Sequence, residues 1–274
     1  VMRFLDNVLT DFINRAPKSF ENAKYAAMRE RSVGLGVMGF HSFLQKKSIP
    51  LESVMSKSWN NKIFKHIQQE VDKASKKLSD ERGACPDAEE YGFKERFSNK
   101  TAIAPTASIS IICGGASPGV EPVAANSYTH KTLSGSYNVR NKYLKKLLEK
   151  YEKNNDDVWS SITTNQGSVE HLEFLTENEK DVFKTAFELD QRWIVDLGAD
   201  RTPYISQAQS INIFLPADVH KKDLHQIHFQ AWKKGLKSLY YCRSKSIQRA
   251  ENINNNLSTN VTKNESNESK DYEE

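Results

Sequence analysis

Two apolar segments near the C-terminus are separated by a segment with helical spacing, and this arrangement constrains the fold more than any other feature. Residues 210–215 are predicted to form a strand that Pro216 ends, and residues 236–242 are predicted to form another. Between them, apolar residues recur at helical spacing from Leu224 to Ala231. Strands joined by such a long crossover pair in parallel, so the sequence predicts an α/β protein.

Composition narrows the possible functions. The chain has 274 residues, of which 38% are hydrophobic and 27% charged, which is enough for a sizeable core. The net charge of +4 is mild, and no basic stripe alternates with aromatic residues, so we expect no nucleic-acid partner. No apolar run is long enough to cross a membrane. Cys85, Cys113 and Cys242 are scattered without a CxxC motif, which favours a reducing cytoplasm and predicts neither disulfides nor a metal site.

Further helices are predicted from the spacing of apolar residues. They cover residues 4–13, residues 56–78 with Gly83 as the stop, and residues 144–151. A capping box, Thr176-Glu-Asn-Glu179, opens another predicted helix that continues to Leu197 and ends at Gly198. These amphipathic faces are expected to form the core.

The segment Gly34-Leu-Gly36-Val-Met-Gly39 matches the GxGxxG pattern of dinucleotide-binding folds. That fingerprint requires a hydrophobic strand immediately before it, whereas residues 27–32 are charged and helix-like. Small residues in a turn-rich helix that packs closely on a neighbour explain the glycines more simply. A nicotinamide-dependent dehydrogenase is therefore kept only as a distant alternative.

Residues 101–122, TAIAPTASISIICGGASPGVEP, combine a short strand, a proline and a run of small hydroxyl residues. Pro105 ends the strand, and if residues 108–113 open a helix, its free N–H groups would face a small anion. The candidate binding residues are Pro105, Thr106, Ala107, Ser108 and Ile109. Taken alone, the segment favours a strand, a turn and a capped helix without a ligand.

Five motifs occur in one order along the chain, and together they are more specific than any one of them. They are Arg31-Ser-Val-Gly-Leu-Gly-Val-Met-Gly39, the TAIAPTAS of residues 101–108, Gly119-Val-Glu-Pro122, Gln209-Ser-Ile-Asn-Ile213, and the segment from His228 to Tyr241. In this order the chain resembles the large (α) subunit of class I ribonucleotide reductase. The resemblance covers roughly residues 1–250 and corresponds to the C-terminal half of that subunit's catalytic barrel.

The resemblance implies a fold and a domain division. We expect the C-terminal half of a ten-stranded α/β barrel with surrounding helices over residues 1–248. Residues 249–274 are rich in Asn, Ser, Glu and Lys and are expected to form a disordered polar tail.

The resemblance also implies functional residues. The loop at residues 105–109 would bind the phosphates of a ribonucleoside diphosphate substrate. Tyr240 and Tyr241 would be the catalytic pair that relays an oxidising equivalent from the small (β) subunit to a substrate-attacking cysteine. As neighbours on a predicted strand, the two tyrosines are expected to point to opposite faces. As simple packing, two tyrosines in a strand need no redox role.

Some of the family's functional groups are missing from the matched region. None of the three cysteines lies in the motif of the radical-forming cysteine, so an N-terminal portion of the α subunit is expected to supply it, together with the ATP and dNTP effector sites. We expect no cofactor on this chain, a radical-generating metal centre in the β subunit, and a thioredoxin- or glutaredoxin-type reductant. The alternative from another class is a non-catalytic or degenerate nucleotide-binding α/β fragment.

Overall fold

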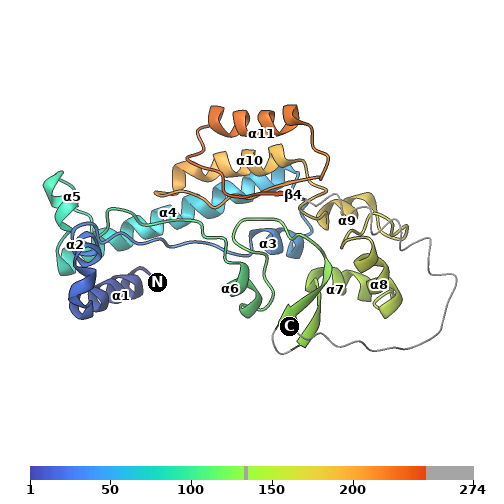
Figure 1. The fold of residues 1–274 in the computed structure, drawn as a ribbon, viewed down its shortest axis with the longest axis horizontal. Helices are drawn as coiled ribbons and strands as arrows, with labels where there is room; N and C mark the ends of the chain where they lie inside the picture. The colour runs from blue at the N-terminus through green and yellow to red at the C-terminus, as the bar shows by residue number, and fades with distance from the viewer. Residues whose placement is uncertain (133–134, 245–274) are drawn as a thin grey trace, which may run out of the picture.

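The computed structural model describes residues 1–132 and 135–244 (Figure 1). The α-helices are α1 Met2–Arg15, α2 Glu21–Glu30, α3 Phe40–Lys46, α4 Val54–Arg82, α5 Pro86–Glu90, α6 Ala107–Ile112, α7 Lys142–Lys150, α8 Asp156–Thr164, α9 Glu177–Val182, α10 Gln191–Arg201 and α11 Lys221–Lys233. The strands are β1 Ser127–Thr132, β2 Gly135–Arg140, β3 Ile213–Leu215 and β4 Cys242–Ser244. Short 3₁₀ turns cover Lys18–Phe20 and Thr202–Tyr204.

Extended segments from four parts of the chain lie side by side in parallel. Leu35 bridges Thr101, and Ile103 bridges Gln209 in the segment that continues into β3. Strand β3 then pairs with β4, with Ile213 opposite Cys242. Because helices lie between these segments along the chain, the α/β class that the crossover predicted is confirmed. The strands β1 and β2 form a separate antiparallel hairpin.

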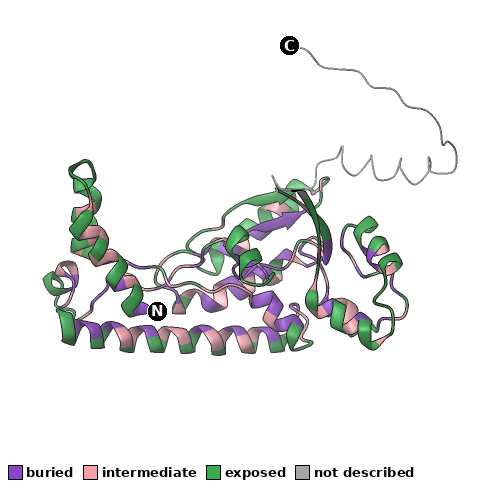
Figure 2. Cartoon of the chain, turned by 90° about the horizontal axis from the view of Figure 1, so that it is seen from below, coloured by how far each residue is buried: buried purple, intermediate pink, exposed green. Residues whose placement is uncertain are grey.

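The long helix α4 is the main support of this arrangement. The Ser53 side chain accepts a hydrogen bond from Ser56 N at 3.1 Å, and Gly83, with φ +84°, follows the last turn. With 29 residues the helix is about 44 Å long. Buried residues recur along its whole length (Figure 2), so one face of α4 packs on α10 and another part on α1. The helix predicted over residues 56–78 is confirmed.

The buried apolar residues form three clusters. The largest joins α3, α4, α10, β3 and α11, and includes Leu44, Phe64, Val195 and Ile213. A second, around Trp159 and Leu148, holds α7, α8 and α9 together. The third packs α1 and the far half of α4 against Phe97. Figure 1 shows the α7–α9 group and the α1, α2 and α5 group at opposite ends of the molecule.

A buried carboxylate anchors α1 to the rest of the third cluster. Asp6 is fully buried and accepts hydrogen bonds from Arg31 Nε at 2.9 Å, Arg82 Nη1 at 2.6 Å and Arg96 Nε at 2.8 Å. Burial alone would raise the pKa of Asp6, but the bonds from the three arginines outweigh it and hold the pKa below its ordinary value. One side chain of α1 thus ties together three other parts of the chain.

The glycine-rich segment at residues 34–39 is not helical, because Leu35 forms a β-bridge with Thr101 and α3 begins only after Gly39, so the prediction of a turn-rich helix there was wrong. A Cβ on Gly36 would lie 2.5 Å from the carbonyl oxygen of Ala102, and one on Gly34 would lie 3.1 Å from the Ala102 Cβ. The glycines therefore allow a close approach, as predicted, but between two extended backbones. This arrangement does not support a dinucleotide-binding turn.

The single helix predicted from Thr176 to Leu197 is two helices. The capping box of Thr176 and Glu179 opens α9 as predicted, but α9 ends at Val182 and α10 begins at Gln191. The helix is interrupted because Ala186 N donates to Val123 O, at 2.8 Å, on a distant segment. Gly198 lies inside α10, where a Cβ would approach Ile211 Cδ1 to 2.6 Å, so it serves packing and does not end the helix.

The C-terminal strand, helix and strand appear in the predicted order with different boundaries. Strand β3 covers only the last part of residues 210–215, and β4 starts at Cys242, where the predicted strand was to end. The helix between them, α11, is confirmed, and so is the parallel pairing.

The tail predicted at residues 249–274 lies outside the described residues. No helix in the described part of the chain is long and apolar enough to span a membrane.

Candidate active site

Helix α3 holds the glycine-rich end of the predicted phosphate loop. Ser42 and Ser117 exchange two hydrogen bonds, from Ser42 N to Ser117 Oγ at 3.1 Å and from Ser117 N to Ser42 Oγ at 2.8 Å. Gly39 N, at the start of α3, donates to Ser117 O at 2.8 Å. The ring of His41, which is fully buried, accepts from Val123 N at 3.0 Å through Nδ1. These bonds fix residues 117–123 against a buried helix.

The loop itself is held in an unusual backbone conformation. Thr106 has φ +52° in the left-handed region, which a β-branched residue seldom adopts, and it precedes α6. Its Oγ1 accepts a hydrogen bond from Gly119 N at 2.7 Å. The first helical bond of α6 runs from Ser110 N to Thr106 O, at 2.9 Å, so the amides of residues 107–109 make no intrahelical bond. Ala107, Ser108 and Ile109 are exposed, and Pro105 is half-buried.

A second set of hydrogen bonds connects this loop to the C-terminal segment. Asn212 N donates to Glu121 Oε1 at 3.3 Å, and Tyr241 N donates to Asn212 Oδ1 at 3.0 Å. Gly119 and Glu121 belong to one motif, and Asn212 to another. Four of the five motifs therefore meet in one network, from Thr106 through Gly119 and Glu121 to Asn212 and Tyr241.

Tyr240 and Tyr241 lie beside each other, and the prediction that they point to opposite faces was wrong. Their ring centroids are 4.1 Å apart with the planes inclined by 47°. Alternation fails because β4 begins only at Cys242, so neither tyrosine belongs to the strand. Both rings are about half exposed. The neighbouring Tyr241 hydroxyl raises the pKa of Tyr240 above its ordinary value.

Sequence analysis did not single out Glu121, Asn212 or Arg243 as functional residues. Glu121 is buried, and this burial raises the pKa of its carboxyl, although bonds from Asn212 and the nearby positive charge of Arg243 oppose the shift. The Arg243 guanidinium lies 5.7 Å from the centroid of the Tyr241 ring. Glu121 and Asn212 both stand inside quoted motifs, which was the only signal that could have found them.

In the described part of the chain, no cysteine side chain takes part in the hydrogen bonds of this network, although Cys242 directly follows Tyr241. Cys85 is buried, whereas Cys113 and Cys242 are exposed, and all three are free thiols. Within residues 1–132 and 135–244, no three His, Cys, Asp or Glu side chains are grouped so that they could hold a metal ion.

The buried His41 ring predicts a stability that depends on pH. Burial lowers the pKa of His41 from 6.5 to about 4, because protonated Nδ1 would face the Val123 N–H donor without solvent. In the unfolded chain His41 therefore takes up a proton as the pH falls through 6.5, whereas in the folded chain it does so only near pH 4. The contribution of His41 to the free energy of unfolding is expected to be constant above pH 6.5. It should fall by up to about 3 kcal/mol on acidification to pH 4. Urea unfolding at several pH values measures this slope.

His41→Asn is the matched control for that prediction, because its Oδ1 can still accept from Val123 N and it does not titrate. The difference in unfolding free energy between the variant and the parent chain should change with pH over the same interval. A difference that stays constant from pH 4 to 7 would mean that His41 is not the group responsible.

Comparisons with known proteins identify the family of this chain. A model of the family "Ribonucleotide reductase, barrel domain" matches residues 1–96 and 86–242. The ribonucleoside-diphosphate reductase large subunit of Invertebrate iridescent virus 6 is 48% identical over 260 residues, covering 93% of this chain and 27% of that protein. The putative large subunit of Frog virus 3 (isolate Goorha) is 40% identical, with 89% of this chain and 43% of that protein covered.

A solved structure gives the same result. The Actinobacillus ureae class Id ribonucleotide reductase alpha subunit matches with a TM-score of 0.82 and 40% identity, covering 89% of this chain and 45% of that chain. This chain therefore spans less than half the length of these relatives. The resemblance drawn from the five motifs is confirmed, and so is the fold class, part of an α/β barrel. The chain belongs to the ribonucleotide reductase barrel-domain family.

Proposed function

We propose that this chain supplies the substrate-phosphate loop and the tyrosine relay of a ribonucleoside-diphosphate reductase α subunit, which reduces ribonucleotides to deoxyribonucleotides. The observation that carries the proposal is the network from Thr106 through Glu121 and Asn212 to Tyr241. It connects a loop of exposed backbone donors to a pair of touching phenols. One set of hydrogen bonds would then fix the position of the phosphate-binding loop relative to the two tyrosines.

The phosphate-binding part rests on donors that converge at the start of α6. The amides of residues 107–109 are left without helical partners, and the Thr106 hydroxyl, whose oxygen already accepts from Gly119, keeps its proton to donate. Ser108 adds an exposed hydroxyl. Hydrogen bonds to a charged phosphate are stronger than those between neutral groups, so several such donors can hold the diphosphate of the substrate.

The relay part rests on the two phenols. Oxidation of a tyrosine can be coupled to release of its phenolic proton, and a neighbour in hydrogen-bond contact can take over the oxidising equivalent. Tyr240 and Tyr241 are such neighbours, because their ring centroids are 4.1 Å apart. Their partial exposure leaves them accessible to a β subunit, whose radical-generating metal centre would start the transfer.

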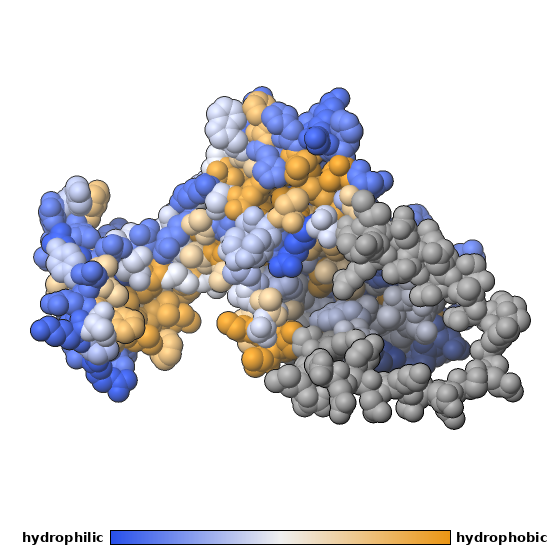
Figure 3. Space-filling view, in the orientation of Figure 1, coloured by the Kyte–Doolittle hydropathy of each residue, from blue (hydrophilic) through white to orange (hydrophobic). Residues whose placement is uncertain are grey.

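The remaining parts would come from other segments and proteins. An N-terminal portion of the α subunit would supply the radical-forming cysteine and the ATP or dNTP effector sites, and a thioredoxin- or glutaredoxin-type protein in the cytoplasm would restore the thiols. Apolar side chains that gather on the surface of α1 and α6 (Figure 3) support such a covering portion. Phe4 and Val8 on α1 and Ile112 on α6 are at least half exposed.

Thr106→Val tests the phosphate loop. The variant keeps the shape of the side chain but removes the hydroxyl that accepts from Gly119 and donates to the ligand. We expect the affinity for a ribonucleoside diphosphate such as CDP to fall about 10- to 100-fold, the range for one hydrogen bond to a charged group. The affinity for cytidine, which has no phosphates, should be unchanged. Calorimetry on the full-length α subunit measures both.

Thr106→Ser is the control, because it retains the hydroxyl and should bind CDP about as well as the parent protein. An equal loss of CDP and cytidine binding in Thr106→Val would indicate a general disturbance of the site. Unchanged CDP binding would remove the loop from the phosphate site and favour the alternative of a non-catalytic fragment.

A further inference from the structure

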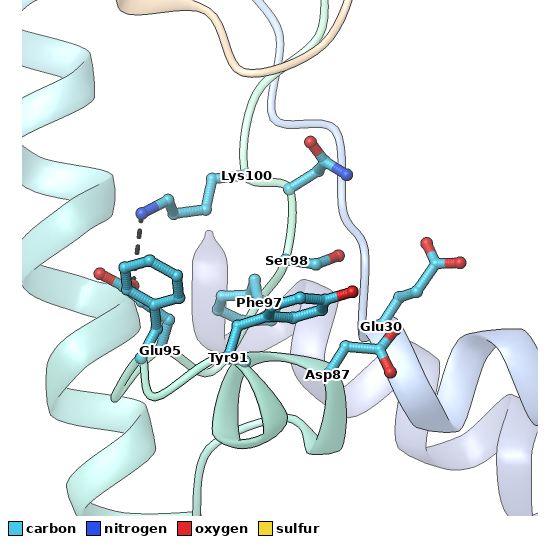
Figure 4. A pocket seen from close by; sticks show the side chains of 10 residues that line it. Glu30, Asp87, Tyr91, Glu95, Phe97, Ser98 and Lys100 are labelled. Carbon is cyan, nitrogen blue, oxygen red and sulfur yellow. Dashed lines mark hydrogen bonds and ion pairs between the residues drawn. The ribbon is translucent and has the colours of Figure 1, made fainter.

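One cavity combines largely apolar walls with two cations and no carboxylate. This α6 cavity has a volume of about 390 Å³ and lies between α6, the β1–β2 hairpin and the start of α7. Four other cavities of about 350–420 Å³ in the described part of the chain each have at least one carboxylate in their lining. In the cavity beside α5, shown in Figure 4, Lys100 is paired with Glu95 and also with Asp72. Of these five cavities, only the α6 cavity has cations without a carboxylate.

The α6 cavity is on a different side of α6 from the proposed phosphate site. The residues that line it on and just after this helix are three or four positions apart, which marks one face: Ala107, Ser110, Ile111 and Gly114. Thr106, Ser108 and Ile109 of the proposed phosphate loop do not line it. The opposite wall includes Tyr128 and Val139, which face each other across the hairpin.

Lys142 places an ammonium group at the rim of the α6 cavity. Its Nζ donates to the carbonyl oxygen of Gly114 at 2.9 Å, and Gly114 lines the same cavity. This acceptor is neutral, and within residues 1–132 and 135–244 no Asp or Glu side chain pairs with Lys142. An ammonium group has three N–H donors, so the bond to Gly114 leaves it able to bind a ligand.

The position of Lys142 in its helix also favours an anion nearby. Lys142 is the first residue of α7, and no acidic residue lies in the first turn. The amino end of a helix carries a partial positive charge, so a cation there is unfavourable without a neighbouring anion. The Asn141 side chain already accepts from Tyr143 N and Leu144 N, at 3.0 and 3.4 Å, so side chains and not the free helix end would hold the anion.

Arg140 is the second cation in the lining, and its ion pair lies at the surface. Its Nη2 is 2.8 Å from Asp156 Oδ1, but the Asp156 side chain is 90% exposed. Such exposed pairs contribute little to stability, so Arg140 can turn toward a ligand at small cost. Its guanidinium carries five N–H donors, which leaves several for a second carboxylate.

The rest of the lining is mostly apolar or already hydrogen-bonded. Asn141 Nδ2 donates to Asn126 Oδ1 at 2.8 Å and to Gln45 Oε1 at 3.0 Å, so these amide groups bond to one another. The apolar lining residues include Ile111, Ala116, Pro118 and Val139. The volume lies in the range of small-molecule sites, which are mostly apolar with a few fixed polar groups. A molecule that matches this lining has an apolar body and one anionic end.

We propose that the α6 cavity binds a small apolar carboxylate, with its apolar body between α6 and the hairpin and its carboxylate at Lys142 and Arg140. A carboxylate fits both the planar guanidinium and the ammonium group. Because α6 is a shared wall, an occupant would also restrict the helix whose first amides are proposed to hold substrate phosphates. That second consequence rests on the proposed function, whereas binding to the cavity does not.

Octanoate, 1-octanol and octylammonium are the probes, because they share an unbranched eight-carbon chain and differ in the charge at one end. Saturation-transfer NMR on the full-length α subunit should show that octanoate binds about tenfold more tightly than 1-octanol, the range for a hydrogen bond to a charged group. Octylammonium should not bind, because its charge would meet two cations.

Lys142→Gln tests the anion-binding group, since glutamine can still donate to the Gly114 carbonyl but has no charge. The variant should lose about tenfold in octanoate affinity and keep its affinity for 1-octanol. Lys145→Gln is the matched control, because Lys145 is on the same helix, is 53% exposed on its side chain and does not line the cavity. Its octanoate affinity should equal that of the parent protein.

Val139→Phe tests the cavity itself, because the larger ring fills the space from the hairpin without changing a charge. It should abolish binding of octanoate and of 1-octanol, while circular dichroism and CDP binding remain those of the parent protein. Absence of octanoate binding to the parent protein, or binding that Val139→Phe leaves unchanged, would overturn the site.

Equal affinities for octanoate and 1-octanol would overturn the role of the two cations. Equal losses in Lys142→Gln and Lys145→Gln would show that only the general positive charge of α7 attracts the anion, which also contradicts the proposal. Thr106→Val, the test of the phosphate loop, should leave octanoate affinity unchanged, so the two proposals can fail separately. Loss of CDP binding in Lys142→Gln would make the cavity part of the substrate site and overturn its assignment as a separate one.

Discussion

Tyr241→Phe is expected to lower turnover of the assembled reductase by at least about 1000-fold, equivalent to roughly 4 kcal/mol of activation free energy. The phenylalanine ring can keep the packing against Tyr240, and the backbone bonds to Ile213 and Asn212 do not involve the side chain. Only the phenolic hydroxyl is lost, and without its proton the ring cannot be oxidised by coupled loss of an electron and a proton. CDP binding should stay within about twofold of the parent value, which corresponds to less than 1 kcal/mol.

Tyr240→Phe should give the same result, because a relay through two adjacent phenols needs both hydroxyls. Tyr25→Phe is the matched control: Tyr25 is 60% exposed on α2, outside the network, and its variant should turn over normally. The assay is deoxyribonucleotide formation by the α subunit with its β subunit and a dithiol. Near-normal turnover of either relay variant would rule out the relay.

Asp6→Ala is expected to be the most damaging single change to stability. It leaves the guanidinium groups of Arg31, Arg82 and Arg96 without their carboxylate, and the side chains of Arg31 and Arg96 are no more than 10% exposed. Removing one partner of a buried ion pair typically costs 3–5 kcal/mol, and three arginines share this partner. Urea unfolding monitored by circular dichroism should show a loss of about that size or more.

Asp11→Ala provides the comparison on the same helix. Asp11 pairs with Arg15 on the surface at 2.7 Å, with both side chains more than half exposed. Such exposed pairs contribute little, so the variant should lose no more than about 1 kcal/mol. Losses of similar size in the two variants would contradict the anchoring role given to Asp6.

The elements predicted well from the sequence are those specified by residues within the element itself. Helix α4 has a capping serine, a regular apolar face and a glycine stop, and the prediction located it to within a few residues. The α9 capping box is equally local. The β1–β2 hairpin was not predicted, because its polar residues lack the alternation that identifies a half-buried strand.

The errors come from contacts between distant parts of the chain. The apolar positions from Val182 to Leu197 fit one continuous helix, and most of them are buried, yet the bond from Ala186 N to Val123 O interrupts it. The tyrosine pair was identified through the resemblance, but its geometry depends on where β4 begins.

The left-handed backbone of Thr106 costs stability at a position where the side chain is needed for the loop. A threonine in this region is disfavoured by about 1–2 kcal/mol relative to glycine, which adopts it freely. Selection for heat resistance alone would thus favour Thr106→Gly, although this substitution removes the hydroxyl that accepts a hydrogen bond from Gly119 N. Engineering a thermostable version of this chain should therefore leave residue 106 untouched and seek its gains elsewhere.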